Sequence, residues 1–159
     1  MGSQKTMVEI PYYEQKTDYT CGPACLKMVF EHLGQKTTKR ELAALMNTTP
    51  EAGTHTDEMP RAAEAHGFSA FTKKDASVED IKSFIRRGIP VIVDYVEPAA
   101  EDRHFAVAVG FDDETLVLND PWHGEGFRLQ ISEFELRWAD LRNRYQKWLM
   151  AVYGEERSA

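Results

Sequence analysis

The spacing of apolar residues changes at Ile89, and this change constrains the fold more than any other feature of the sequence. Before Ile89, apolar residues recur every three or four positions, which is typical of amphipathic helices. After Ile89, short runs of β-branched and aromatic residues are typical of strands. Neither an internal repeat nor a low-complexity linker separates the two parts. The sequence therefore predicts an α+β fold in which helices come first and an antiparallel sheet follows.

The length of the chain favours one domain. A chain of 159 residues, 42% of them hydrophobic, can bury one core but is short for two. We expect a single domain over residues 7–154, with residues 1–6 and 155–159 as flexible tails.

Start and stop signals divide the first part of the chain into four helices. Thr38 and Glu41 form a capping-box pattern, and so do Ser77 and Asp80. Glycines follow the apolar helical patterns at positions where they can end a helix. The predicted helices span about 21–33, a short stretch after Thr38, about 56–66, and the stretch between Ser77 and Gly88.

The second part of the chain is predicted to be mainly sheet, with one more helix at about 132–141. Residues 112–114 form a short polar connection between two strongly β-forming runs, so those runs are expected to pair as a hairpin. The predicted strands are 91–95, 104–111, 115–119, 127–131 and a closing strand at 148–153.

The charge and the apolar runs of the chain exclude several classes of partner. The formal net charge is -7 and the basic residues are scattered, so neither nucleic acid nor an anionic membrane surface is an expected partner. No apolar run approaches the roughly 20 residues of an integral membrane segment. The N-terminus lacks the apolar core of a secretory signal, so we expect a cytoplasmic protein.

The two cysteines, Cys21 and Cys25, lie one helical turn apart in the first predicted helix. This spacing on a helix rarely suits a disulfide, and no zinc-finger pattern is present. Cys21 stands at the helix start, where unpaired backbone N–H groups and the helix dipole stabilise a thiolate. Cys25 lies a turn further in and fits the core as a small apolar side chain. Cys21 is therefore the candidate nucleophile, and we expect no cofactor or metal.

The predicted strand that begins at His104 has one bulky face and one small face. The small face carries Ala106, Ala108 and Gly110 together with His104. A helix packed closely on this small face would bring its N-terminal Cys21 to the end of the strand that carries the histidine. Such an approach is what a thiolate and imidazole pair requires, although a single histidine at a strand end is more often structural.

Asp120 and Gln15 complete a candidate site. Asp120 ends the next strand, and a hairpin would set its carboxylate near His104, where it could hold the imidazole tautomer. The side-chain amide of Gln15, six residues before Cys21, could bind an oxyanion together with the backbone N–H of Cys21. Asp120 before Pro121 is also a common turn former. A metal site built from Cys21, His104 and Asp120 is conceivable, but it would leave Gln15 without a role.

These segments resemble a known family. QKTDYTCGPACL, from Gln15 to Leu26, is similar to the active-site segment of the C39 and C39-like cysteine peptidases, which are compact papain-like domains. HFAVAVGF from His104 and VLNDPW from Val117 resemble the histidine and aspartate segments of that family, in the same chain order. The resemblance implies a papain-like fold with Cys21 as nucleophile, His104 as base, Asp120 as orienting carboxylate and Gln15 as oxyanion donor.

The resemblance also implies a reaction. It is thiol-dependent hydrolysis of a peptide, amide or isopeptide bond through an acyl-enzyme, with a peptide or protein substrate and no cofactor. Trp122 and His123, which follow the aspartate segment, are candidate substrate-binding residues that could line the cleft. The alternatives are a papain-like acyltransferase or transglutaminase-like enzyme, and a peptide-binding module that does not cut. Many bacteriocin-processing members have Asp directly before the cysteine, where this chain has Thr20, so a leader-peptide substrate is not implied.

Overall fold

A computed structural model describes residues 6–139 and 146–154 of the chain. Over these residues the strands form one seven-stranded antiparallel sheet in the order β2-β7-β3-β4-β5-β6, and β1 pairs with β4. The strands are β1 (Thr6–Met7), β2 (Ser69–Lys73), β3 (Val91–Val96), β4 (Arg103–Phe111), β5 (Thr115–Asp120), β6 (Gly124–Gln130) and β7 (Leu149–Tyr153). The helices are α1 (Cys21–His32), α2 (Lys39–Leu45), α3 (Glu58–Ala65), α4 (Val78–Arg86) and α5 (Ile131–Trp138).

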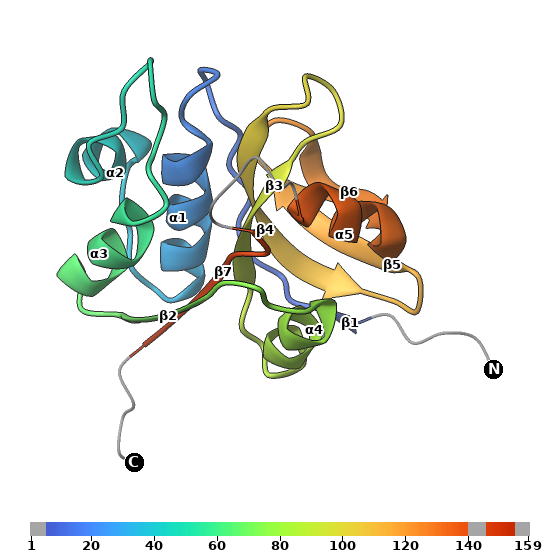
Figure 1. Ribbon diagram of the computed structural model, residues 1–159. Helices are drawn as coiled ribbons and strands as arrows, with labels where there is room; N and C mark the ends of the chain where they lie inside the picture. The colour runs from blue at the N-terminus through green and yellow to red at the C-terminus, as the bar shows by residue number, and fades with distance from the viewer. Residues whose placement is uncertain (1–5, 140–145, 155–159) are drawn as a thin grey trace, which may run out of the picture.

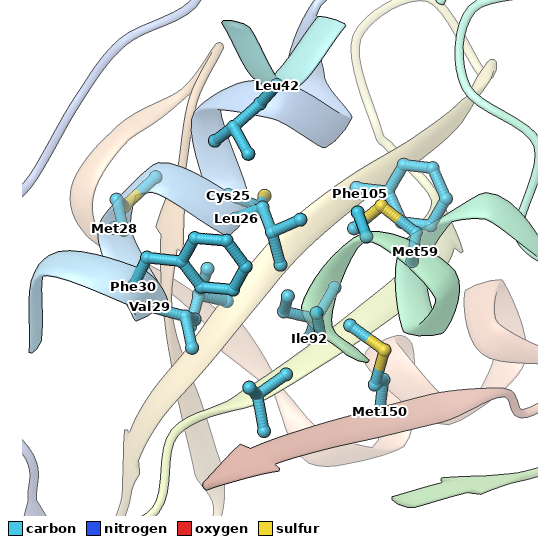
Figure 2. Packing of buried hydrophobic residues seen from close by; sticks show 14 of the residues in the cluster. Cys25, Leu26, Met28, Val29, Phe30, Leu42, Met59, Ile92, Phe105 and Met150 are labelled. Atoms are coloured by element: carbon cyan, nitrogen blue, oxygen red, sulfur yellow. The ribbon is translucent and has the colours of Figure 1, made fainter. Parts of the chain in front are cut away.

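The helices cover both faces of the sheet. Figure 1 shows α1, α2 and α3 grouped on one side of the sheet, with α4 and α5 apart from them. The core beneath α1 is large and apolar, and Figure 2 shows side chains of α1 facing those of β3, β4 and β7. Leu26 and Phe30 of α1 belong to the same buried cluster as Ile92, Phe105 and Met150 of the three strands. Burial of these side chains fixes α1 against the sheet.

The face of the sheet on which α1 packs corrects one expectation. Phe105 and Val107, on the bulky face of β4, belong to the cluster under α1. Ala106 and Ala108, on the small face, belong to the cluster under α4 and α5. The prediction that the helix of Cys21 packs on the small face is therefore wrong. The small face of β4 instead packs in the cluster that contains large aromatic side chains. These are Tyr95 of β3 and Phe134 and Trp138 of α5.

Most of the predicted elements are confirmed. Capping boxes at Thr38 and Ser77 begin α2 and α4, with both reciprocal hydrogen bonds present. The predicted hairpin joins β4 and β5, and Asp112 accepts hydrogen bonds from two backbone N–H groups within its turn. The last part of the helix predicted at 132–141, residues 1–5 of the predicted N-terminal tail and the whole predicted C-terminal tail lie outside the described residues.

Three features of the strands were not predicted. β2 is mostly exposed and lacks apolar alternation, so its sequence carries no strand signal. β1 is two residues long and includes Thr6, which the sequence assigned to the N-terminal tail. β6 begins at Gly124, three residues before the predicted start.

The topology brings several connections to one end of the molecule. The segment before α1, the connection from α2 to α3 and the connection from β3 to β4 extend to the same end, at the top of Figure 1. The start of α1 and the start of β4 also lie at this end. No helix within the described residues is long and apolar enough to span a bilayer.

Candidate active site

Cys21 is the first residue of α1 and faces the first residues of β4. Its Sγ receives a hydrogen bond from the backbone N–H of Phe105, at 3.5 Å between nitrogen and sulfur. Cys21 is partly exposed, whereas Cys25 is buried, and both are free thiols. Burial raises the pKa of Cys25 well above its usual value, so this thiol remains protonated. The structure thus distinguishes the two thiols by access and by environment.

His104 and Asp120 form a buried hydrogen-bonded pair. Nε2 of His104 lies 2.6 Å from Oδ1 of Asp120, and the Asp120 side chain is fully buried. Oδ1 also accepts the backbone N–H groups of Trp122 and His123, at 2.9 and 3.0 Å. Burial alone would raise the pKa of Asp120, but the hydrogen bonds from His104, Tyr95 and His123 outweigh it and lower the pKa. Asp120 is therefore held as a carboxylate.

The position of His104 between Asp120 and Cys21 determines its charge. Burial lowers the pKa of His104, but the hydrogen bond to Asp120 and the contact with Cys21 outweigh burial and raise the pKa to about 10. Because Nε2 is bonded to Asp120, Nδ1 is the ring nitrogen left to exchange a proton with Cys21. The arrangement can hold an imidazolium beside a thiolate, which is the charge state of an activated cysteine nucleophile.

Gln15 lies against the turn that follows Asp120. Its backbone N–H donates to the carbonyl oxygen of Pro121 at 3.0 Å, and its Nε2 donates to the carbonyl oxygen of Thr17 at 2.7 Å. A second hydrogen bond joins this segment to the same turn, because the hydroxyl of Tyr12 donates to the backbone carbonyl oxygen of Asp120 at 2.7 Å. Oε1 of Gln15 is buried and has no hydrogen-bond partner among the described residues. One Nε2 hydrogen of Gln15 remains available for a further acceptor.

A cleft of about 400 Å³ opens beside Cys21 and His104. One wall is the connection from α2 to α3, where residues 50–56 line the space. The buried Asp94 also lines the cleft. It forms an ion pair of 2.5 Å with Arg103 and accepts a hydrogen bond of 3.5 Å from Oγ1 of Thr56. Burial raises the pKa of Asp94, and the charge of Arg103 counteracts this only in part. Polar groups therefore form much of the surface that a bound molecule would contact.

Gly22 allows this wall to approach the start of α1. A Cβ atom at Gly22 would lie 2.7 Å from Oγ1 of Thr54, closer than such atoms approach in folded proteins. Thr54 is fixed in turn by a hydrogen bond of 2.7 Å between its Oγ1 and that of Thr48. The residue after Cys21 must therefore be glycine for the cleft to keep this shape.

Trp122 and His123 are placed differently from the cysteine, histidine and aspartate. Neither of them is among the residues that line this cleft. Trp122 is 57% exposed. The His123 ring is mostly buried, and its Nε2 lies 2.8 Å from Oε1 of Glu97.

Three groups at the site carry no signal in the sequence. The Phe105 N–H is a backbone group, and Tyr95 lies in the apolar run VIVDYV, where it looks like a core residue. Glu97 stands in a connection between strands, where a carboxylate is ordinarily solvated. Tertiary contacts between segments that are distant in the sequence bring these groups to the site. In the described part of the chain, no group of three or more His, Cys, Asp or Glu side chains is placed to hold a metal ion.

Comparison with known proteins gives the family. Residues 7–146 match the sequence profile of the Peptidase_C39 like family. The chain belongs to this C39-like family. An uncharacterized protein of Methanothermobacter marburgensis is 34% identical over 110 residues, which cover 69% of this chain and 70% of the relative.

Solved structures show the fold of this C39-like chain. The peptidase domain of Streptococcus ComA, a bi-functional ABC transporter involved in quorum sensing, superposes with a TM-score of 0.74 at 21% identity, covering 94% of this chain and 98% of that domain. A double glycine motif protease from an AMS/PCAT transporter, in complex with its leader peptide, superposes with a TM-score of 0.76 at 18% identity, covering 98% and 99%. The predicted C39 peptidase fold is thereby confirmed.

Proposed function

We propose that this C39-like protein is a thiol-dependent hydrolase that cleaves a peptide, amide or isopeptide bond through an acyl-enzyme. The observation that carries the proposal is the buried hydrogen bond of 2.6 Å between His104 and Asp120, next to the helix start that presents Cys21. The cleft beside Cys21 gives a carbonyl carbon access to the sulfur. Membership in the C39-like family supports the same reaction class.

Acylation is the first half of the proposed reaction. The Cys21 thiolate attacks the carbonyl carbon, a C–S bond forms, and negative charge moves to the carbonyl oxygen. The backbone N–H of Cys21 and Nε2 of Gln15 are the proposed donors to this oxyanion. His104, charged through its contact with Cys21 and Asp120, gives the Nδ1 proton to the amine as the C–N bond breaks. The products of this half are a free amine and a thioester on Cys21.

Deacylation reverses the role of His104. Neutral His104 takes a proton from water, the oxygen of that water attacks the thioester, and the C–S bond breaks to release a carboxylic acid. Asp120 stays ionised throughout and stabilises the imidazolium that is present before acylation and forms again in deacylation. No residue changes its net protonation over one turnover.

The proposed substrate is a peptide segment, because polar groups form much of the lining of the cleft beside Cys21. The double glycine motif protease that was solved in complex with the leader peptide supports binding of a peptide by this fold. Asp94 and Arg103 would meet polar or charged groups of that peptide, since both line the cleft near Cys21.

The proposal is tested with the wild-type chain and the Cys21→Ala variant on a peptide library. Wild type should release new termini and form a thioester that intact-mass spectrometry detects after acid quench, and Cys21→Ala should do neither while remaining folded. An added amine that captures most of the acyl group would assign acyl transfer instead. Tight peptide binding by both forms, with no cleavage by either, would assign a binding module and refute the hydrolase.

A further inference from the structure

A second pair of histidine and carboxylate lies beside the proposed catalytic residues. His123 Nε2 lies 2.8 Å from Oε1 of Glu97, and the two side chains are only 16% and 7% exposed. The His123 ring stacks on Phe127, with centroids 4.6 Å apart and planes at 15°. It also meets the His104 ring edge-on, at 6.4 Å between centroids. Three partners thus hold an imidazole that the proposed reaction does not use.

Glu97 organises the connection that leads into His104. Its carboxylate accepts the backbone N–H groups of Ala99, Ala100 and Asp102, at 2.8, 2.6 and 3.3 Å. Its own N–H donates to the carbonyl oxygen of Asp102 at 3.0 Å. Burial raises the pKa of Glu97, but the hydrogen bonds from His123 and from these backbone groups outweigh burial and lower the pKa. Glu97 is therefore an ionised anchor for the whole connection between β3 and β4.

His123 organises the turn that follows Asp120. Its backbone N–H donates to Oδ1 of Asp120 at 3.0 Å, the same oxygen that binds Nε2 of His104. The His123 side chain reaches away from that turn to Glu97. The pair therefore joins the connection before His104 to the turn after Asp120, the two segments whose relative position sets the distance between His104 and Asp120.

We propose that Glu97 and His123 are positioning residues that hold Asp120 against His104, and that His123 does not contact substrate. The proposal rests on the proposed function, because positioning matters only if His104 and Asp120 activate Cys21. Small displacements of such groups have large effects, since a shift of about 1 Å can lower a rate roughly 100-fold. Cys21 itself is held by the start of α1 and by the backbone N–H of Phe105. The pair of Glu97 and His123 therefore affects Cys21 through Asp120 and His104.

The test measures how fast iodoacetamide alkylates Cys21 across pH, which needs no substrate. His123→Ala and Glu97→Gln should each slow alkylation near neutral pH by roughly 10-fold or more and shift its pH profile, because His104 then stabilises the thiolate less well. The same changes are made in an Asp120→Asn background. There they should have little further effect, because the residue through which they act no longer carries its charge.

Three controls keep the result interpretable. His32→Ala removes an imidazole from the last turn of α1, outside the site, and should leave alkylation unchanged. Thermal unfolding shows whether each variant remains folded. His123→Gln keeps a side-chain N–H at a similar reach and should restore much of the lost alkylation rate, even where His123→Ala proves too unstable to assay.

Two results would overturn the proposal. Effects of His123→Ala that are equal in the wild-type and Asp120→Asn backgrounds would show that His123 does not act through Asp120. Unchanged alkylation together with a raised KM for a peptide would make His123 a substrate-binding residue. If wild type cleaves no peptide but the alkylation results are as expected, the hydrolase fails while the positioning role stands.

Discussion

The hydroxyl of Tyr95 donates a hydrogen bond of 2.5 Å to Oδ2 of Asp120, the carboxylate oxygen opposite the one that binds His104. Tyr95 lies directly across from His104 in the pairing of β3 with β4. Burial, and then the charge of Asp120, raise the pKa of Tyr95 far above its usual value, so its hydroxyl stays a donor. Both oxygens of Asp120, at the end of β5, are thus fixed by side chains of other strands, His104 of β4 and Tyr95 of β3.

Tyr95→Phe should lower the free energy of unfolding by about 1–3 kcal/mol, because it leaves Oδ2 of Asp120 buried without this donor. The free energy is measured by urea unfolding at several pH values. The pKa of Asp120 is lowered in the folded state, so the stability that depends on its charge is present above its unfolded pKa of about 3.9 and is lost as the pH falls through the folded value. The effect of Tyr95→Phe should therefore be largest above pH 4.

Tyr153→Phe is the matched control for this experiment, since it removes a hydroxyl from a tyrosine that is 39% exposed. It should change the free energy of unfolding by less than about 0.5 kcal/mol. An equal loss in both variants, or a loss from Tyr95→Phe that does not depend on pH, would show that the hydroxyl does not act on the charge of Asp120.

The helices, strands and turns that form the site could be predicted from the sequence better than the packing between them. The capping boxes at Thr38 and Ser77 and the hairpin at Asp112 depend on residues within a few positions of one another, and all three form as predicted. The same hairpin leads to the observed contact between His104 and Asp120. These features are readable because neighbouring residues decide them.

The features that the sequence did not show depend on distant segments. The face of β4 that meets α1 is decided by volume on both sides of the sheet, including Tyr95 and Phe134, which alternation within one strand does not reveal. β2 is a strand because β7 pairs with it along its whole length, and its own side chains are mostly exposed. The role of Glu97 also depends on a distant segment, since its partner His123 lies 26 residues away in the sequence.

The charge of His104 should respond to Asp120. The folded pKa of His104, about 10, lies above the usual 6.5, so its contribution to stability is fully present below about pH 6.5 and is lost as the pH rises through about 10. Asp120→Asn removes the carboxylate that helps raise this pKa. The alkaline limb of kcat/KM for any verified substrate, which requires the imidazolium, should therefore move to lower pH. An unmoved limb would show that Asp120 does not raise the pKa of His104.

Iodoacetamide should modify Cys21 far faster than Cys25 near neutral pH. Cys21 is partly exposed, at a helix start and beside His104, while Cys25 is fully buried with a raised pKa. Peptide mapping after partial labelling measures both rates in one sample. Cys25 should react at the rate of a free thiol only after unfolding in denaturant. Equal rates in the folded protein would contradict the assignment of Cys21 as nucleophile.

Gly22→Ala should displace the wall of the cleft that contains Thr54 but should not destabilise helix α1 itself. The added Cβ would meet Thr54 at 2.7 Å, so the connection from α2 to α3 must shift, although alanine itself favours the helix. We expect roughly 10-fold or greater loss of turnover with a loss of stability of about 1–3 kcal/mol. Gly154→Ala, where a Cβ would meet nothing within 4 Å, is the control. Unchanged turnover in Gly22→Ala would show that this wall does not contact substrate.

Gln15→Ala tests the oxyanion donor separately from the nucleophile. An alkylating agent forms no oxyanion, so Cys21 alkylation should remain nearly as fast as in wild type. Turnover of an amide substrate does form an oxyanion, and removing one donor should lower it by roughly 100-fold or more. The backbone bond from Gln15 to Pro121 survives the substitution, so the segment stays attached to the turn after Asp120.

Gln35→Ala, which removes an exposed amide elsewhere on the surface, is the control and should change neither rate. Unchanged turnover in Gln15→Ala would mean that other donors stabilise the oxyanion. The role of the Gln15 side chain would then be limited to its hydrogen bond with Thr17. A slower alkylation equal to the slower turnover would give Gln15 a different role, in which it maintains the local structure around Cys21. Only loss of turnover with intact alkylation assigns Gln15 to the intermediate.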